Sequence, residues 1–208
     1  MGVEVIFLIA ILVVSVVIHE VAHGFAANYL GDPTAKLQGR LTLNPVSHID
    51  PMGSIVLPAI LALSSSPFLF GWAKPVPYNP YNLQRGGRWS EAMVAFAGPA
   101  ANIAIALIFG IFIRFGALPA SMVSLAVSIV FLNILLAVFN LIPIPPLDGS
   151  KILPQLLPRG LALQYERIRV MLEGNILLGF GIVLVFILLF GSQFATVISA
   201  ISRFIIGA

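Results

Sequence analysis

The sequence predicts an all-α polytopic membrane protein with about four to six membrane segments. Only 9% of the 208 residues are charged and 59% are hydrophobic, whereas an ordinary soluble domain carries about 25% charged residues. The apolar residues also gather in runs long enough to cross a hydrocarbon core of about 30 Å. The longest polar stretch, near residues 71–91, is too short for a separate soluble domain. We therefore expect one membrane-embedded domain over residues 1–208.

The first apolar segment runs from Met1 to Leu30. It lacks the basic start and the cleavage site of a signal peptide, so we expect a retained helix. Four further stretches follow at 52–70, 92–113, 121–142 and 175–190, with a weaker one at 193–206. In the 52–70 stretch, Pro58 and Pro67 bracket a polar serine triplet, which indicates a re-entrant or broken segment.

Two shorter segments have periodic patterns. Residues 35–43 alternate between apolar and polar side chains, which predicts a short strand in a β-hairpin-like or re-entrant element after the first helix. Residues 159–173 place apolar side chains on one helical face and charged ones elsewhere. That pattern is typical of a helix lying at the membrane surface.

The strongest chemical pattern is HEVAH at residues 19–23, near the end of the first segment. On a helix, positions i and i+4 share a face, so His19 and His23 can both reach one metal ion while Glu20 faces a water beside it. Three ionisable groups so close together in a membrane helix are costly unless they are functional. The alternative is a polar cluster that merely reaches the interface. The chain has no cysteine, so any metal must bind through His, Asp or Glu.

A second pattern, NLIPIPPLDG at residues 140–149, follows the 121–142 helix. Its prolines force the chain out of the helix, and unwound backbone at membrane depth usually lines a site. Asp148 alone would suit a turn or a helix N-cap. A carboxylate is, however, the ligand that the two histidines lack, so we predict Asp148 as the third ligand. The other acidic residues lie in poorer contexts, and His48 with its neighbour Asp50 is expected to be structural or gating.

With HEVAH at 19–23, GPAAN at 98–102 and NLIPIPPLDG at 140–149, the sequence resembles the site-2 protease family of intramembrane zinc metalloproteases, in its short prokaryotic form without a PDZ or CBS domain. The resemblance implies that His19, His23 and Asp148 bind one Zn²⁺ per chain and that Glu20 activates water. It also implies hydrolysis of peptide bonds within or next to transmembrane helices of membrane-protein substrates. Asn102 and Asn140 are candidate transition-state or substrate contacts; polar contacts between helices are the alternative for both.

Two other functions remain open from the residues. One is a transporter or channel in which the buried His, Glu and Asp form an ion path. The other is an inactive relative that only binds membrane helices, although the intact Glu20 argues against it. The expected partners are the lipid bilayer and transmembrane substrates, and the few charges form no basic face for nucleic acid. A strand edge at 35–43, or one beginning at Lys74 to Pro77, would be able to pair with an unwound substrate.

The membrane topology follows from the predicted ligands. The two histidines and Asp148 reach one metal only if two crossings separate them, which requires 52–70 to enter and return. Nine basic residues then lie on one side, with Arg114 and Arg203 on the other, whereas a fully spanning 52–70 divides them seven to four. The positive-inside rule makes the side with nine charges cytoplasmic. We expect a multi-pass protein of the cell (inner) membrane with its active site nearer the cytoplasmic face.

Overall fold

The computed structural model describes residues 3–56, 60, 63 and 72–207, and these residues contain helices and no β-strand. The α-helices are α1 (Val3–Leu30), α2 (Thr34–Leu37), α4 (Ser90–Arg114), α5 (Ala120–Asn140), α6 (Gly149–Leu156), α7 (Arg159–Glu173) and α8 (Ile176–Ile206). Short turns of 3₁₀ or π helix lie at η1 (Pro45–His48), η2 (Pro51–Val56), η3 (Pro80–Asn82) and η4 (Gly87–Trp89). In this part of the chain, four helices are long and apolar enough to span a membrane: Val5–Leu30, Gly87–Arg114, Ala120–Asn140 and Leu178–Ile206. The predicted all-α membrane class is confirmed.

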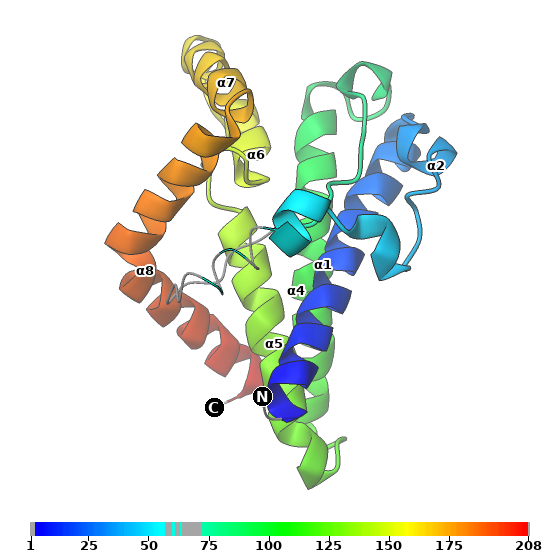
Figure 1. Cartoon of the computed structure of the whole chain (residues 1–208), viewed down its shortest axis with the longest axis vertical. Coiled ribbons are helices and arrows are strands. Elements are labelled where there is room, and N and C mark those ends of the chain that lie inside the picture. The colour runs from blue at the N-terminus through cyan, green and yellow to red at the C-terminus, as the bar shows by residue number, and fades with distance from the viewer. Residues whose placement is uncertain (1–2, 57–59, 61–62, 64–71, 208) are drawn as a thin grey trace.

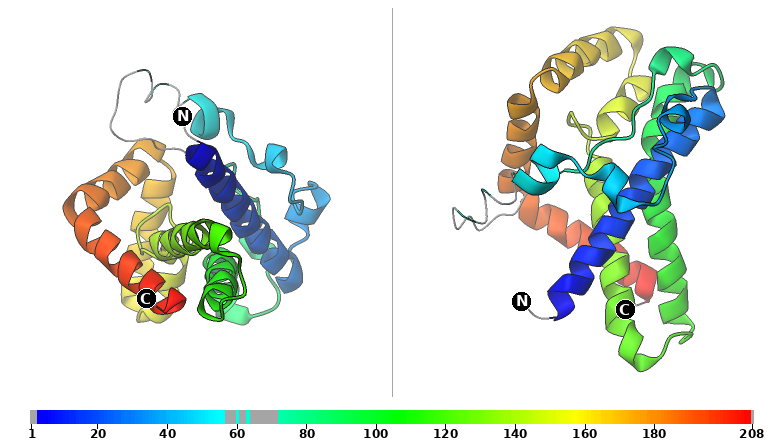
Figure 2. Two further views of the ribbon diagram at one scale, coloured as in Figure 1. Left: turned by 90° about the horizontal axis from the view of Figure 1, so that it is seen from below. Right: turned by 45° about the vertical axis from the view of Figure 1, so that its right-hand side comes forward.

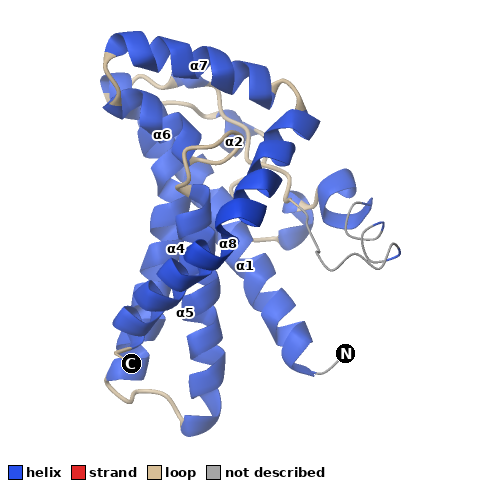
Figure 3. Ribbon diagram, turned by 90° about the vertical axis from the view of Figure 1, so that its left-hand side faces the viewer, coloured by secondary structure: helices blue, strands red, loops and turns tan. Residues whose placement is uncertain are grey.

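The four long helices alternate in direction. In Figure 1, α1 and α5 run upward while α4 and α8 run downward. Helix α5 lies in the middle of the bundle, between α1 and α4 on one side and α8 on the other (Figure 2). Ala106, Val130, Ile134 and Ile198 form a buried apolar cluster where α4, α5 and α8 meet. Helix α7 crosses the end of the bundle at which α1 and α5 finish (Figure 3).

The end of α1 lies against the start of α4. The carbonyl of Leu30 accepts hydrogen bonds from the backbone amides of Gln84 and Arg85, each at 3.0 Å. The carboxylate of Asp32 adds a second tie, since it accepts from the amide of Asn79 at 2.7 Å and from the side chain of Asn82 at 2.9 Å. The chain therefore returns, before α4, to the side of the bundle where α1 ended. Most of the 52–70 stretch lies outside the described residues, so its re-entrant course stays a prediction.

The strand predicted over residues 35–43 was wrong. The carboxylate of Asp32 accepts hydrogen bonds from the amide and hydroxyl of Thr34, at 3.2 and 2.6 Å, and this starts the helical turn α2. Gly39 ends the turn with a left-handed φ of +65°. The alternation in this segment does not define a buried face, because Leu37 and Leu43 are both exposed. Local capping by Asp32 thus outweighs a weak period-two pattern.

The C-terminal half of the chain agrees with the prediction in one element and differs in another. Helix α7 has the predicted bounds, and Arg169 on its inner face pairs with Glu91 of α4 at 3.1 Å. The stretches at 175–190 and 193–206, in contrast, form the single helix α8. The intervening Gly191 and Ser192 continue the helix, and the hydroxyl of Thr196 donates to the carbonyl of Ser192 at 2.9 Å. Glycine is well tolerated in membrane helices, so this short polar interval does not end α8.

Candidate metal centre

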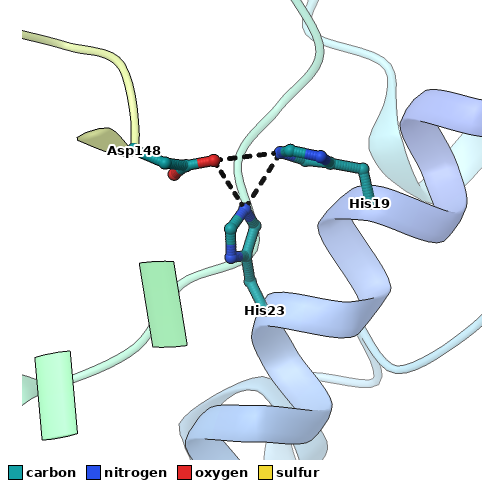
Figure 4. A group of neighbouring side chains, drawn as sticks. All are labelled: His19, His23 and Asp148. Carbon is teal, nitrogen blue, oxygen red and sulfur yellow. Dashed lines mark hydrogen bonds and ion pairs between the residues drawn. The ribbon is translucent and has the colours of Figure 1, made fainter. Parts of the chain in front are cut away.

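His19 and His23 lie one turn apart on α1 and point toward the same space (Figure 4). Both side chains are buried. Their Nε2 atoms are 3.0 Å apart, and the two rings meet edge to face with centroids separated by 4.6 Å. The i, i+4 spacing therefore brings both imidazoles to one point, as the sequence pattern predicts.

Asp148 approaches the histidines from the loop between α5 and α6. Its Oδ2 atom lies 3.2 Å from Nε2 of His19 and 3.2 Å from Nε2 of His23. Asp148 is the N-cap residue of α6 by position, but its side chain makes no capping hydrogen bond there. The loop folds back so tightly on the end of α5 that a Cβ at Gly149 would overlap the carbonyl of Leu141. Glycine at 149 therefore allows the turn that carries Asp148 to the histidines.

The donor set fits a metal ion. The Nδ1 atom of His19 lies 2.6 Å from Oδ1 of Asn102, and the Nδ1 atom of His23 lies 2.7 Å from the carbonyl of Val94. Carbonyl oxygens only accept, so each ring carries a proton on Nδ1, and in the neutral ring required for metal binding the Nε2 lone pair faces the other ring and Asp148. The buried Oδ2 of Asp148 consequently has no hydrogen-bond donor. Three lone pairs facing one another repel unless a cation lies between them.

The spacing of these atoms agrees with zinc. Tetrahedral zinc with bonds of about 2.0–2.1 Å places its ligand atoms about 3.3 Å apart. The three contacts among His19, His23 and Asp148 measure 3.0, 3.2 and 3.2 Å. In the described residues, this is the one group of three or more His, Asp or Glu side chains that converge in this way.

Gly98 on α4 leaves room for both rings. A Cβ at this position would overlap the Nε2 end of His23 and would lie 2.7 Å from Cε1 of His19. Glycine is therefore the residue that allows α4 to pass directly behind the two imidazoles. The GPAAN motif thus supplies both a steric gap at Gly98 and a hydrogen-bond acceptor at Asn102.

Glu20 shares a cavity of about 430 Å³ with the three converging residues. Its Oε2 atom accepts a hydrogen bond from the backbone amide of Val76 at 2.9 Å. Val76 is buried and belongs to an extended segment, residues 72–78, several of whose residues line the cavity. Trp72, at the start of this segment, stacks on Phe180 of α8 with ring centroids 4.9 Å apart. The segment thus covers one side of the cavity and fixes the direction of the Glu20 carboxylate.

The same segment is poorly suited to the strand addition considered for Lys74 to Pro77. Pro75 and Pro77 have no amide hydrogen, and the amide of Val76 is bound to Glu20. The amide of Lys74 donates to the carbonyl of His48 at 2.9 Å. Every backbone donor from residues 74 to 77 is therefore absent or already bound, so an added strand would find carbonyl acceptors alone.

The two candidate asparagines occupy different places. Asn140 lines the cavity, and its Nδ2 donates to the carbonyl of Leu136 in its own helix at 2.9 Å. Asn102 is fully buried behind the ring of His19, and the residues lining the cavity do not include it. His48 is buried elsewhere, with Nε2 2.9 Å from the carbonyl of Thr42. Asp50 accepts from the amide of Gly53 and is outside the converging group.

Several features of the site could not be assigned from the sequence. Gly98 belongs to the GPAAN motif, but its steric role, like that of the carbonyl of Val94, depends on how α4 packs on α1, which periodicity does not specify. Lys151, one turn beyond Asp148, lines the cavity with its ammonium 5.3 Å from the ring centre of Tyr78. Burial opposes its charge, but Tyr78 and the nearby carboxylates outweigh burial and raise the pKa of Lys151. The cavity therefore holds a fixed positive charge.

Comparison with known proteins agrees with this geometry. The model of peptidase family M50 matches residues 114–180. YwhC of Bacillus subtilis, named as a zinc metalloprotease, is 40% identical over 164 residues, which cover 74% of this chain and 70% of YwhC. The chain belongs to peptidase family M50. This membership confirms the resemblance to site-2 proteases that the two motifs indicated.

The chain is also similar to two Rip2 proteins that are longer than it. Rip2 of Mycolicibacterium smegmatis, also named as a zinc metalloprotease, is 38% identical over 152 residues, which cover 69% of this chain and 54% of Rip2. Rip2 of Mycobacterium tuberculosis is 33% identical over 148 residues, with 70% of this chain and 55% of Rip2 covered. The chain thus spans about half the length of the Rip2 proteins. No solved structure matches it.

Proposed function

We propose that this M50 peptidase is an intramembrane zinc metalloprotease that holds one Zn²⁺ through His19, His23 and Asp148. The observation that carries the proposal is the convergence of two Nε2 lone pairs and a buried carboxylate oxygen within 3.0–3.2 Å of one another. Three protein ligands leave a fourth position open, as catalytic zinc sites do. A purely structural site would use a fourth protein ligand.

The residues around the centre support peptide hydrolysis. Bound zinc supplies Lewis-acid chemistry toward water and toward a peptide carbonyl. Glu20 serves as the general base, taking a proton from the attacking water and returning it to the leaving amine. The Val76 amide holds one carboxylate oxygen of Glu20, which leaves the other oxygen for that proton. Asn140, in the wall of the same cavity, is the candidate contact to the substrate.

The depth of the centre favours membrane-embedded substrates. At a rise of 1.5 Å per residue, His19 lies about 17 Å along α1 from its end at Leu30. Residues on both sides of it belong to an apolar span from Val5 to Leu30. A soluble polypeptide does not reach that depth, whereas a transmembrane helix that unwinds locally does. We propose that the substrates are membrane proteins cleaved within or next to their transmembrane helices.

The charges support a cytoplasmic location for the centre. The segments between α1 and α4 and between α5 and α8 leave the bundle at the end where α7 lies (Figure 3). Arg114 and Arg203 lie in the last turns of α4 and α8, at the other end. By the positive-inside rule the α7 end is cytoplasmic. The nine basic residues of those two segments are Lys36, Arg40, Lys74, Arg85, Arg88, Lys151, Arg159, Arg167 and Arg169.

The proposal is tested by separating metal binding from turnover. The protein would be purified in detergent, its zinc content measured, and its cleavage of a panel of single-span membrane proteins followed. His19→Ala, His23→Ala and Asp148→Ala should each lose zinc and activity, whereas Glu20→Gln should keep zinc and lose activity. His48→Ala is the matched histidine control and should keep its zinc. Full zinc occupancy and turnover in Asp148→Ala would contradict the ligand assignment.

A further inference from the structure

Three buried polar side chains form a chain behind His19, one from each of three packed helices. They are Ser15 of α1, Asn102 of α4 and Asn133 of α5. Both asparagines are 0% exposed and Ser15 is 3% exposed. A buried amide without hydrogen-bond partners is costly in the apolar interior of a membrane protein, so each of these side chains needs partners there.

The hydrogen bonds all donate in one direction, from His19 outward through Asn102 and Asn133 to Ser15. Nδ2 of Asn133 donates to Oγ of Ser15 at 3.0 Å, and Oδ1 of Asn133 accepts from Nδ2 of Asn102 at 2.9 Å. Oδ1 of Asn102 then accepts from Nδ1 of His19 at 2.6 Å. The last member of this series, Nε2 of His19, faces Asp148.

Two backbone carbonyls fix the orientation of both amides. Nδ2 of Asn133 also donates to the carbonyl of Ile129 at 2.9 Å, and Nδ2 of Asn102 also donates to the carbonyl of Ser15 at 3.3 Å. Because a carbonyl accepts and never donates, neither amide can be turned over without placing oxygen against oxygen. The oxygen of Asn102 must therefore face His19, and the proton of that ring must be on Nδ1.

We propose that Asn133 and Ser15 are positioning residues that act through Asn102 to hold His19 in the metal-binding tautomer and thereby set the zinc affinity. This inference rests on the proposed zinc site. Without Asn133, Asn102 loses one acceptor for its amide group and is held by the single, longer bond to Ser15. A turned Asn102 would present its amide hydrogens to Nδ1 of His19. The ring proton would then move to Nε2, where it blocks the metal.

The test measures zinc binding and the state of the ring in the full chain in detergent. Zinc dissociation constants come from competition with a chelator. Asn133→Ala should bind zinc about 10–100-fold more weakly than the wild type. Ser15→Ala should also weaken zinc binding, by a smaller factor. Ser128→Ala is the control, because Ser128 lies on α5 and its hydroxyl bonds only to Ser124 of the same helix at 3.1 Å.

Two further readouts separate positioning from simple helix packing. The chain contains three histidines, so nitrogen-15 labelling of histidine gives a simple spectrum. In the zinc-free protein, the ring proton of His19 should be on Nδ1 in the wild type and shift toward Nε2 in Asn133→Ala. Adding Asn133→Ala to Asn102→Ala should weaken zinc binding no further, because both act through one contact.

The outcomes are distinct. Wild-type protein that binds no zinc would contradict the proposed function itself. Wild-type protein that binds zinc, beside Asn133→Ala and Ser15→Ala with dissociation constants within about twofold of it, would overturn only the positioning role. Additive effects of Asn102→Ala and Asn133→Ala would also overturn it, because they would indicate independent packing contributions. If Asn133→Ala does not fold, the smaller change Ser15→Ala decides.

Discussion

The backbone amide of Val76 lies 2.9 Å from Oε2 of Glu20 and donates a hydrogen bond to it. These residues are far apart in the sequence, yet Val76 is the position between Pro75 and Pro77 that can donate. The two prolines restrict the backbone on either side of the Val76 amide. Neither proline has an amide hydrogen that could compete for the Glu20 carboxylate. The carboxylate of Glu20, the proposed general base, is thus oriented by the main chain, whose position depends little on the identity of the side chain.

Val76→Pro should lower kcat with zinc content unchanged, because it deletes the amide that holds Glu20. Val76 lies outside any helix and already precedes a proline, so a further proline at 76 interrupts no secondary structure. A hydrogen bond to a charged group is worth about 1.5–3 kcal/mol, so a loss of about 10–150-fold in kcat is expected. Val76→Ala keeps the amide and removes the buried side chain, and it serves as the control. Equal kcat values for the two variants would show that the amide has no role in turnover.

Gly98→Ala should abolish stoichiometric zinc binding without unfolding the protein. Alanine is a better helix former than glycine, so α4 itself gains from the change. The added methyl, however, enters the space held by the rings of His19 and His23. Gly181→Ala is the matched control, since Gly181 lies in the membrane helix α8 with open space at its Cβ position. Zinc content measured on both purified variants checks this, and a fully loaded Gly98→Ala would contradict the packing of α4 on α1.

The convergence of His19 and His23 could be predicted from the sequence because their spacing has a local geometric meaning. His23 lies four positions after His19 on one helix, and the distance between them does not depend on the rest of the fold. Asp148 was predicted because a carboxylate is the ligand that the two histidines lack. Gly98 and Asn133, in contrast, act across helix interfaces, and single-sequence periodicity does not specify which faces of α4 and α5 meet α1.

The errors in the predicted fold have physical causes of the same kind. The pattern of residues 35–43 suggested a strand because alternation is a weak signal over so short a segment. The deciding contact was Asp32 to Thr34, which lies just before the pattern begins. The stretches at 175–190 and 193–206 were predicted as separate because the apolar run is interrupted between them, but helix α8 continues through the interruption. Continued helical bonding satisfies the backbone there, as a lipid environment requires.

Asp32 should make the stability of the protein pH-dependent. Burial alone would raise the pKa of Asp32, but hydrogen bonds from Thr34, Asn82 and Asn79 outweigh it and lower the pKa below its ordinary value. A lowered folded-state pKa stabilises the fold above the unfolded value of about 3.9, and that contribution is lost as the pH falls through the folded pKa. Asp32→Asn should therefore show a flatter decline of melting temperature between about pH 5 and pH 2 than the wild type.

The size of the Asp32 effect can be measured at neutral pH. Asp32→Ala removes the acceptor for groups on both sides of the junction between α1 and α4, and should lower the free energy of unfolding by about 2 kcal/mol. Asp50→Ala is a suitable control, because among the described residues the hydrogen bonds of Asp50 are to its neighbours Gly53 and Ser54. Thermal unfolding of the two variants at pH 7 gives the comparison. A melting temperature for Asp32→Ala equal to that of the wild type would show that the junction is held by the backbone bonds of Leu30 alone.

Accessibility labelling should place the two ends of the 31–86 segment on one face of the membrane. The chain has no native cysteine, so single cysteines at Lys36, Gln84 and Pro119 give unambiguous signals. All three positions are exposed. In intact cells, a membrane-impermeant thiol reagent should label Pro119 and should spare Lys36 and Gln84 until the membrane is opened. Opposite labelling of Lys36 and Gln84 would contradict the contact of Leu30 with Gln84 and Arg85.

The placement of the ligands on segments far apart in the chain also affects how the protein is made. Chains are synthesised from the N-terminus at about 5–20 residues per second, so Asp148 follows His23 by roughly 6–25 seconds. During that interval the two histidines and Glu20 are already in the membrane without the third ligand. The proposed zinc site is complete only when α4 and α5 are in place, because Asn102 and Asp148 come with them. Under the proposed function, neighbouring membrane helices would be exposed to hydrolysis only after Asp148 has been translated.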